Sequence, residues 1–560
     1  MVAIPQVWRN DYRHPGSWDR NYPPLSMPQM FADSAAAHSQ AYLADFMGRK
    51  FSYADVRSAV NRVARGLQDL GIGQGDRVGL FLPNVPHYLA AYYGAMRAGA
   101  TVVNFSPLYT PAELEAQVED SGTRLLFTLN AAALLPTALE VLDCSTLERL
   151  VVGSVAGVLP FAKALLYPLV QRRDIAVLPR RAEVTPFSRL IDNKGDFDPV
   201  DCDPRSDLAL IQYTGGTTGT PKGAMLTHQN LTANARQVHD LDHDPEAEDR
   251  IMAVLPFFHV FANTCVLNRT VWRGGEIVML PRWNAAQALE AMERTRATAF
   301  PGVPTMYTAL LDHPRTPNTD FSSLRLCISG GAPLPVETKR RFEALTRAKL
   351  VEGYGLTESS GVVSSNPYEG EDRPGTIGQP VAGTVVRLVD KENPHEPAPP
   401  GEPGEIVIAG PQVMKGYWNR PEADAEAFVD GYLRTGDVGT IDEEGFITIV
   451  DRLKDMISVS GYKVFPSVIE DALYGHESVR EAIVIGVPDD YHGEMPKAFV
   501  TLREGAAIDG ETLRAWLNAR LGKHERVSAV AVRDDLPKTM IGKLDRKALR
   551  AEERAAGDLR

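Results

Sequence analysis

The chain has 560 residues, of which 44% are hydrophobic and 23% charged, and its formal net charge is −13. This ordinary globular composition excludes a largely disordered chain. The acidic balance argues against a nucleic-acid-binding protein, because phosphate backbones require a basic surface, although local dipoles still allow a small anionic ligand. The four cysteines show neither a CxxC pair nor a zinc spacing, so a disulfide scaffold and a structural metal are disfavoured and a reducing compartment is favoured.

The first part of the chain alternates helical and strand patterns. The N-terminus has no basic start followed by an apolar stretch, so no signal peptide is predicted. Residues 53–70 have helical spacing and end before a glycine, residues 77–82 are strand-like, and residues 85–98 are helical again. Such alternation predicts an α/β fold in which helices cover a sheet.

Residues 150–170 form the most apolar segment of the chain. Glycines, prolines and one lysine interrupt it, whereas a spanning helix needs about 20 predominantly apolar residues. A buried strand followed by a loop is the preferred interpretation. The alternative is a segment that lies in a membrane interface, because Arg172 and Arg173 follow directly.

Residues 208–223 run from an apolar strand into a loop of glycines and threonines that ends near one lysine. Glycines let the backbone fold closely around phosphate oxygens, threonine hydroxyls donate hydrogen bonds, and a lysine supplies compact positive charge. The loop is not a Walker A motif, which ends in Gly-Lys-Ser/Thr, and a plain glycine turn is the alternative. The residues of the predicted polyphosphate cradle are Thr214, Gly215, Gly216, Thr217, Thr218, Gly219 and Lys222.

From about residue 375 the pattern changes to short strands. Residues 384–389 and 405–409 flank a proline-rich turn, which predicts a small antiparallel β unit. Residues 451–455 then connect two further strand patterns, and this charged connector is interpreted as a hinge, with a plain solvated loop as the alternative. Ser467 with Glu470 resembles a capping box that opens a helix. The last ~110 residues are expected to form a small α+β domain.

The glycine-threonine loop at residues 213–223 resembles the signature of the adenylate-forming superfamily, which comprises acyl-CoA synthetases, luciferases and peptide-synthetase adenylation domains. Further matches follow in the family's order and cover most of the chain after about residue 205. Residues 411–418 and 443–466 are most similar to long-chain fatty-acid–CoA ligases. The ordered matches are PFFH at 256–259, GVPT at 302–305, GGAP at 330–333, GYGLTE at 353–358, YLRTGD at 432–437, DR at 451–452 and PKTMIGK at 537–543.

The resemblance implies a large α/β adenylation domain over residues 1–451, made of layered subdomains and a small β subdomain, and a mobile α+β lid over residues 452–560. It implies two half-reactions. A fatty carboxylate first attacks the α-phosphorus of ATP with Mg²⁺ present, and the thiol of coenzyme A then displaces AMP from the acyl-AMP. Neither half needs a protein nucleophile, so catalysis rests on positioning and charge stabilisation.

The resemblance also assigns the residues around the phosphates and the ribose. Thr357 contacts the α-phosphate, Glu358 holds Mg²⁺, and Thr214 is a further hydroxyl near the metal. A carboxylate suits Mg²⁺, which keeps several waters and shares phosphate oxygens; a helix first-turn carboxylate is the alternative for Glu358. Asp437 fits the ribose hydroxyls, and Arg452 fits a ribose or phosphate contact.

The adenine site is assigned to the turn that contains Gly331, Ala332 and Pro333. Small residues let a planar ring approach the backbone, and Tyr354 would stack on the base, with Gly355 next to it. Taken alone, the sequence GGAP is only a turn signal.

His259, Val303 and Gly330 are assigned to the acyl site, and Lys543 to the charge that develops during adenylation. A histidine among phenylalanines is otherwise often a core residue, and a lone lysine in a glycine turn is usually solvated. Some family members carry an aromatic gate four residues after this histidine, where this chain has Asn263.

Three functions compete at this point. The first is an ATP-dependent ligase of long- or medium-chain fatty acids, with ATP, coenzyme A and the acid as its partners and no nucleic acid. The second is an aryl-CoA ligase or a carrier-loading enzyme, whose carrier would be a separate chain because no GG[DH]S motif occurs. The third, a non-catalytic lipid-uptake protein, is disfavoured because Glu358 and Lys543 are both present.

The remaining expectations concern the location and the moving parts. A cytoplasmic protein is expected, with peripheral contact at the inner face of a membrane and with a homodimer as further expectations. Lys454, two residues after Arg452, is the expected pivot of the lid, because the lysine and the incoming thiol need access to the same centre. Chain-length preference is not readable, because tunnel depth depends on residues far apart in sequence.

Overall fold

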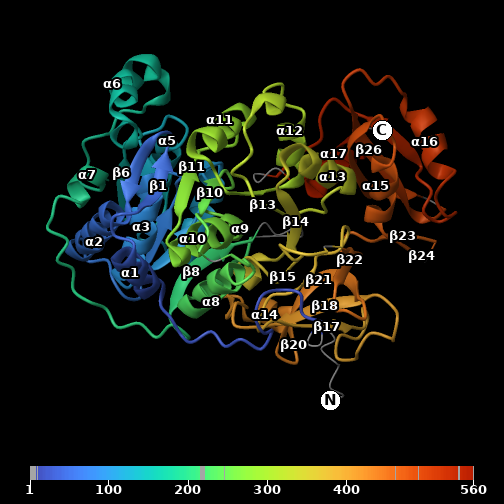
Figure 1. The fold of residues 1–560 in the computed structure, drawn as a ribbon, viewed down its shortest axis with the longest axis horizontal. Coiled ribbons are helices and arrows are strands. Elements are labelled where there is room, and N and C mark those ends of the chain that lie inside the picture. The colour runs from blue at the N-terminus through green and yellow to red at the C-terminus, as the bar shows by residue number, and fades with distance from the viewer. Residues whose placement is uncertain are drawn as a thin grey trace.

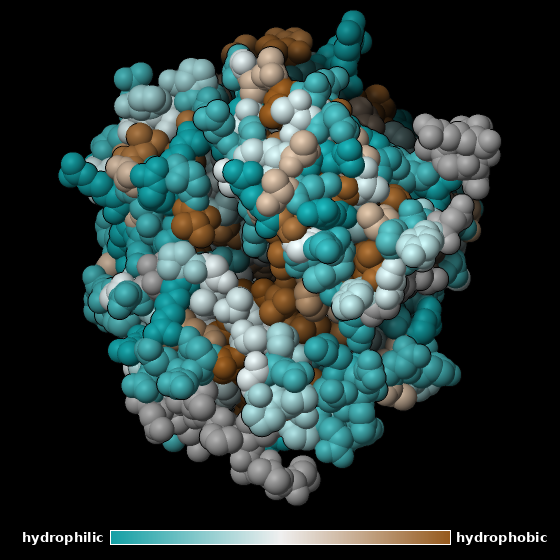
Figure 2. Space-filling model, turned by 90° about the vertical axis from the view of Figure 1, so that its right-hand side faces the viewer, coloured by the Kyte–Doolittle hydropathy of each residue, from teal (hydrophilic) through white to brown (hydrophobic). Residues whose placement is uncertain are grey.

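The structure, a computed structural model, describes residue 8 and residues 11–214, 221–244, 246–371, 373–460, 462–489, 491–539 and 543–558. The structure contains two large sheets, a small β unit and a C-terminal α+β domain (Figure 1). The α/β class with a large N-terminal and a small C-terminal domain, predicted from the sequence, is confirmed. On the face that carries the C-terminal domain, hydrophobic residues line a hollow near the middle of the surface (Figure 2).

The first sheet is mainly parallel, and helices connect its central strands. The predicted helix at 53–70 is α2 (Tyr53–Asp69), capped by Ser52, and the predicted strand at 77–82 is β3 (Arg77–Leu80). The helix α3 (Pro86–Arg97) follows, as the alternation predicted. The strand order is β19 (Gly416–Tyr417), β9 (Gly223–Thr227), β8 (Leu208–Tyr213), β4 (Thr101–Asn104), β3, β5 (Leu125–Leu129), β6 (Arg149–Gly153), β7 (Val184–Pro186).

The second sheet has a parallel centre flanked by antiparallel edges. Because its parallel strands share one direction, the loops that follow them leave from one edge of the sheet. The strand order is β16 (Gln379–Pro380), β15 (Ser364–Ser365), β14 (Lys349–Tyr354), β13 (Leu326–Gly330), β12 (Ala299–Gly302), β10 (Arg250–Ala253), β11 (Glu276–Met279), β1 (Tyr42–Phe46), β2 (Arg49–Ser52). Helices that connect or follow these strands include α11 (Ala285–Thr295), α12 (Pro304–Leu311) and α13 (Val336–Thr346).

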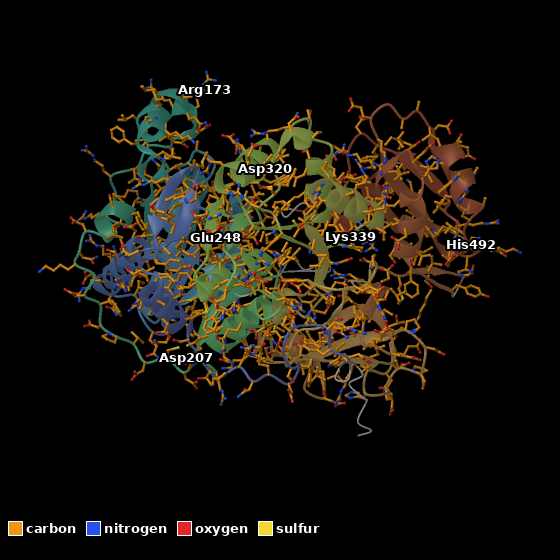
Figure 3. The ribbon with its side chains drawn as sticks, viewed as in Figure 1. Arg173, Asp207, Glu248, Asp320, Lys339 and His492 are labelled. Atoms are coloured by element: carbon orange, nitrogen blue, oxygen red, sulfur yellow. The ribbon has the colours of Figure 1, made fainter. Side chains whose placement is uncertain are left out.

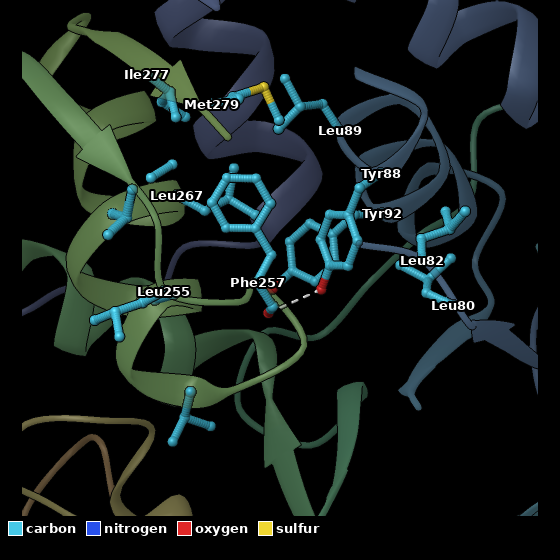
Figure 4. Close-up of a cluster of buried hydrophobic side chains, with 14 of the residues drawn as sticks. Leu80, Leu82, Tyr88, Leu89, Tyr92, Leu255, Phe257, Leu267, Ile277 and Met279 are labelled. Atoms are coloured by element: carbon cyan, nitrogen blue, oxygen red, sulfur yellow. Dashed lines mark hydrogen bonds between the residues drawn. The ribbon is translucent and has the colours of Figure 1, made fainter. Parts of the chain in front are cut away.

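One hydrophobic core contains residues of both sheets and of the helices packed with them. Within it, Tyr88 and Tyr92 of α3 face Phe257, and the Tyr88 hydroxyl donates to the Phe257 carbonyl at 3.1 Å (Figure 4). The loop after β10 is thereby fixed to the first sheet's helix layer. Other helices of this layer are α1 (Met27–Ala37), α8 (His228–His239) and α10 (Arg269–Arg273).

The small antiparallel β unit predicted after residue 375 is present. The strands expected at 384–389 and 405–409 are β17 (Val385–Val389) and β18 (Gly404–Ala409), and they pair with each other. The expected connector is wrong in one respect. Asp451 and Arg452 still belong to a strand, because they pair with Val438 and Asp437. The other strands of the unit are β20 (Phe428–Val429), β21 (Tyr432–Ile441) and β22 (Ile447–Arg452).

The C-terminal α+β domain has hydrophobic clusters of its own, which share no residue with the large core among the described residues. The predicted capping box is wrong. Ser467 lies inside α15 and its hydroxyl donates to Val450 O and Asp451 Oδ2, while Glu470 accepts from Arg546. The elements are β23 (Ile457–Val459), β24 (Tyr462–Val464), α15 (Pro466–Tyr474), β25 (Val479–Asp489), β26 (Gly493–Leu502), α16 (Gly510–Asn518), β27 (Ala529–Val532) and α17 (Arg546–Asp558).

Residues 150–170 only begin as the expected buried strand. Val151 and Val152 are buried in β6, but residues 161–170 form the helix α6 (Phe161–Val170), whose apolar side chains face solvent. The loop interpretation of this second half is therefore wrong. Within the described ranges, no helix combines the length and the hydrophobicity that crossing a bilayer requires.

Candidate active site

The carboxyl ends of four neighbouring parallel strands carry most of the predicted site. β10 leads to His259, β12 to Val303, β13 to Gly330 and Gly331, and β14 to Tyr354. These strands pair in parallel in the order β10, β12, β13, β14. Ligands of open α/β sheets bind at such an edge. The fold therefore gathers motifs that are far apart in the sequence.

The glycine-threonine loop begins and ends at a closed hairpin. β8 and β9 pair up to Tyr213 and Gly223, and the Thr214 N–H donates to the Lys222 carbonyl at 2.9 Å. Thr214 and Lys222 thus lie side by side at the base of the loop. The other residues of the predicted cradle lie outside the described residues: Gly215, Gly216, Thr217, Thr218 and Gly219.

Tyr417 connects Glu358 to Lys222, a role that sequence reasoning missed. Its hydroxyl donates to Glu358 Oε1 at 2.7 Å, and the Lys222 Nζ lies 5.2 Å from the centre of its ring. A ring face attracts a cation, so one tyrosine orients two side chains of the predicted ATP site. The motif singled out at residues 411–418 includes Tyr417. The sequence did not predict the bond, because Glu358 lies 59 positions away and only folding brings the two residues together.

Glu358 suits a hard divalent cation. It follows Thr357 in the one-turn helix η6 (Thr357–Ser359), and its carboxylate is half-buried with Oε1 fixed by Tyr417. One oriented carboxylate is what Mg²⁺ takes from a protein when phosphate oxygens and waters complete its shell. The residues present therefore fit the metal that the sequence predicts.

A chain of polar contacts lies beside the predicted ribose site. The Tyr354 hydroxyl donates to Asp437 Oδ2 at 2.5 Å, and Arg452 Nε lies 2.8 Å from Asp437 Oδ1. Asp437 is only 1% exposed. The carboxylate therefore keeps a fixed orientation at the end of the β21–β22 ladder. Gly355 follows Tyr354 and is packed on the Gly361 carbonyl, where a side chain has no room.

The predicted adenine turn leaves β13 in a backbone conformation that favours glycine. Gly331 has φ +84°, and it is exposed together with Pro333, while Ala332 is half-buried. A Cβ on Gly331 would collide with the Lys543 side chain. This glycine therefore leaves space that the lysine of the C-terminal domain now occupies.

Lys543 reaches the site from the C-terminal domain. Burial, with Arg452 as the next cause, lowers the pKa of the Lys543 ammonium to about 8. The same ammonium also acts on His259. Burial first, and the Lys543 charge second, lower the pKa of His259 to about 3. Electrostatics thus place the lysine near His259, Arg452 and Asp437, where the sequence predicted it to act.

His259 is neutral at physiological pH as a result. Its Nδ1 accepts the Phe261 N–H at 3.3 Å, so the neutral ring carries its proton on Nε2. Phe261 in turn lies against Gly330, whose missing side chain leaves room for the ring. His259 and Gly330, both predicted for the acyl site, therefore adjoin the same phenylalanine.

The predicted acyl-site residue Val303 and the gate position Asn263 both lie in the core. Val303 is 1% exposed and precedes α12, so it lies beneath the site. Asn263 is fully buried, accepts the Tyr92 hydroxyl at 3.0 Å and bonds to Asn268. In this position it belongs to a polar network of the core instead of forming an aromatic gate.

Lys454 is more than a connector residue. It lies two residues beyond the end of the β21–β22 ladder, and its side chain is exposed. Partial desolvation first and then the charge of Arg452 lower the pKa of Lys454, while Asp455, Asp437 and Glu358 act in the opposite direction. The Lys454 ammonium therefore interacts electrostatically with charged groups of the candidate site. The sequence did not predict this interaction.

The comparisons with known proteins agree with this geometry. Residues 31–418 match the family described as AMP-binding enzyme, and residues 468–543 match the AMP-binding enzyme C-terminal domain. The chain belongs to the AMP-binding enzyme family. The adenylate-forming resemblance inferred from the motifs is thereby confirmed.

Relatives of this AMP-binding enzyme match along nearly the whole chain. A long-chain-fatty-acid–CoA ligase of Bacillus subtilis (strain 168) is 41% identical over 98% of both chains. One from Escherichia coli O6:H1 is 36% identical over 99% of both. The crystal structure of ATP-bound MatB from Rhodopseudomonas palustris superposes with a TM-score of 0.83 at 30% identity, covering 95% of this chain and 99% of that one.

Proposed function

We propose that this AMP-binding enzyme activates a long- or medium-chain fatty acid with ATP and transfers the acyl group to coenzyme A, releasing AMP and pyrophosphate. The observation that carries the proposal is the position of Lys543 against Gly331 and near His259, at the strand ends where the nucleotide motifs meet. The full-length similarity to long-chain-fatty-acid–CoA ligases supports the choice of acid.

In the first half-reaction, the chain's residues hold and neutralise charge. Lys543 lies where charge develops between the carboxylate and the α-phosphate, and Thr357 donates a hydrogen bond to that phosphate. Asp437 accepts from the ribose hydroxyls, and Arg452 holds Asp437 in place. Such preorganised contacts commonly supply about 10²–10³ in rate each.

The metal has a defined place in the proposal. Glu358, oriented by Tyr417, holds Mg²⁺, with the Thr214 hydroxyl as a neighbour. When bound, the cation neutralises the phosphate charge that would otherwise repel the attacking carboxylate.

The second half-reaction requires the small domain to turn. Lys543 fills the space at Gly331, and a thiol must then reach the same centre. The ladder between β21 and β22 ends at the pair Asp437 and Arg452, so the chain beyond it is the first part free to rotate. We keep the predicted division into residues 1–451 and 452–560, whose boundary falls at the last pair of this ladder, and we place the pivot just beyond it at Lys454.

A panel of carboxylates tests the substrate class. With ATP, Mg²⁺ and coenzyme A, hexadecanoate and dodecanoate are expected to give thioester far faster than an aryl acid such as benzoate. A preference for the aryl acid would establish the alternative, an aryl-CoA ligase. ATP–pyrophosphate exchange without coenzyme A separates either ligase from a non-catalytic lipid-uptake protein.

We also propose that the enzyme works in the cytoplasm, in peripheral contact with the inner face of a membrane, because its acid substrate is apolar. The homodimer named among the expected partners stays a prediction, and sedimentation equilibrium measures it directly.

A further inference from the structure

The helix α6 is an ordered element that turns its apolar side to solvent. Its large side chains are far more exposed than those of a packed helix. None of its residues is buried. The exposed fractions are 81% for Phe161, 61% for Leu165, 56% for Leu166, 78% for Leu169 and 76% for Val170.

The exposed residues form one face of the helix. Positions 161, 165 and 169 are four residues apart, and 166 and 170 adjoin them, so they share one side. Ala164 and Tyr167 pack back onto the large core instead. The helix therefore has an inner side that fixes it and an outer side whose large apolar side chains are mostly exposed to solvent.

Hydrogen bonds hold this projection to the β1–β2 hairpin. The Lys163 Nζ donates to the Met47 carbonyl at 2.9 Å. Arg49 donates to the Gly157 carbonyl at 2.7 Å, just before the helix. The exposure of the apolar face is thus a property of a fixed element.

Basic residues flank α6 along the sequence, in a chain that is acidic overall. Residues 154–181 contain five arginines and lysines and one aspartate, against a net charge of −13 for the whole chain. Arg181 pairs with Asp143 at 2.7 Å, which leaves Lys163, Arg172, Arg173 and Arg180 as the basic flank. Figure 3 shows Arg173 at the outer end of the projection beside α6.

The projection also lies on the opposite side of the large domain from the C-terminal domain (Figure 1). A surface that covers α6 therefore does not obstruct rotation of the small domain. Docking there is compatible with both half-reactions.

We propose that α6 docks this enzyme on an anionic lipid bilayer, with its apolar face in the headgroup boundary and its basic flank against the lipid phosphates. This inference rests on the proposed peripheral membrane contact and assigns it to one helix. An apolar helical face flanked by lysine and arginine is what such interfacial helices share, because apolar burial and attraction to anionic lipid add together. The apolar segment expected from the sequence, residues 150–170, begins with Leu150, Val151 and Val152, which are buried in β6 and take no part.

Vesicle co-sedimentation tests the proposal with the full chain. We expect binding to vesicles of phosphatidylcholine with phosphatidylglycerol and at least about 10-fold weaker binding to phosphatidylcholine alone. The triple variant Phe161→Gln, Leu165→Gln, Leu169→Gln is expected to lose at least about 10-fold of the binding to anionic vesicles. The double variant Arg172→Ser, Arg173→Ser is expected to lose several-fold and to become less sensitive to salt.

A matched control replaces apolar residues that are exposed elsewhere. Tyr491→Gln with Val532→Gln removes exposed apolar side chains in the C-terminal domain and should leave vesicle binding unchanged. Thioester formation from octanoate, which is soluble, verifies that each variant is folded, because α6 is not part of the site.

Three outcomes would overturn the inference. Equal vesicle binding by the triple variant and the unaltered protein would leave membrane contact standing but remove α6 from it. Absence of binding to any vesicle would remove the membrane contact as well, while thioester formation would still decide the ligase function separately. Loss of self-association in the triple variant, without vesicle binding, would make α6 a contact between copies of the chain.

Discussion

The large domain and the small domain hold their site residues in different ways. In the large domain and at the end of the β21–β22 ladder the predicted site groups are bonded to one another: Tyr354 and Arg452 both contact Asp437, and Tyr417 contacts Glu358. Among the described residues, the backbone of Lys543 in the small domain hydrogen-bonds to Thr539 alone, and its ammonium has no hydrogen-bond partner there. The first set is preorganised by these contacts. Lys543 instead enters the site from the small domain, without a hydrogen bond among the described residues to hold its side chain there.

This difference teaches how one site can serve two half-reactions. Groups that both half-reactions need, for the nucleotide, are fixed by contacts with one another. Lys543, which must move out of the site before the second half-reaction, has no side-chain hydrogen bond to the other site groups among the described residues. Variants that target one set or the other should therefore affect the half-reactions unequally.

The largest effect is expected from Lys543→Ala. Acyl-AMP formation should fall by about 10²–10³, because one preorganised charge is lost, while thioester formation from supplied acyl-AMP should change little. Single-turnover assays of the two halves measure this. Lys538→Ala is the matched control, since that lysine is paired with Glu481 and Asp535. Equal losses in both halves would contradict the assignment.

Glu358→Gln should raise the Mg²⁺ concentration needed for half-maximal adenylation by about 10-fold or more, because an amide lacks the charge that attracts the cation. A magnesium titration of ATP–pyrophosphate exchange measures this. The control is Glu352→Gln, since burial raises the pKa of Glu352 to about 8 and the amide resembles its protonated form. Unchanged metal dependence in Glu358→Gln would exclude it as a ligand.

Lys454→Pro should slow the thioester-forming half about 10-fold more than adenylation. Proline fixes φ near −65° at the proposed pivot, and adenylation needs only one of the two poses. Because the Lys454 ammonium feels the charges of the site, Lys454→Ala separates loss of the side chain from restriction of the backbone. Equal slowing of both halves by the proline would move the pivot elsewhere.

The pH dependence of adenylation should follow the ionisation of Lys543. Its pKa is lowered to about 8. The charged form is therefore present below that pH and is lost as the pH rises through it, so kcat/KM for adenylation should fall above about 8. His259, with a pKa of about 3, does not titrate in this range. Lys543→Arg should remove the decline, and a decline that persists would assign it to another group.

The smallest effect is expected from Tyr417→Phe. It removes the hydrogen bond to Glu358 but keeps the ring beneath Lys222, so the apparent affinity for Mg²⁺ should weaken about 3-fold with kcat nearly unchanged. Tyr432→Phe, on a ring that stacks with Arg387, is the control. A fall in kcat alone would show that Tyr417 acts otherwise.

Local pattern predicted much of the fold. The helix at 53–70 and the strand at 77–82 were readable because apolar periodicity and a capping serine agree there with the packing. The predicted capping box at Ser467 is wrong because both side chains bond to residues distant in the sequence. The Ser467 hydroxyl donates to Asp451, and the Glu470 carboxylate accepts from Arg546. Similarly, Asp451 and Arg452 are strand because β21 pairs with them, which a charged pentapeptide does not reveal.

The candidate site was predictable as a set of residues but not as a set of contacts. Ordered motifs named Glu358, Asp437 and Lys543, since each motif keeps its own local sequence. The bond from Tyr417 to Glu358 joins segments that only the fold brings together. The outward apolar face of α6 was equally hidden, because an apolar run looks the same whether it is buried or exposed.

The separate hydrophobic clusters of the small domain have a consequence for the thermal unfolding of the protein. Two cores that share no residue need not melt together, and a small core is the weaker one. We expect two calorimetric transitions, the first of them in the C-terminal domain. Between them, the large domain would still bind nucleotide although the lysine is gone. A warmed enzyme would thus stop reacting before it stops binding.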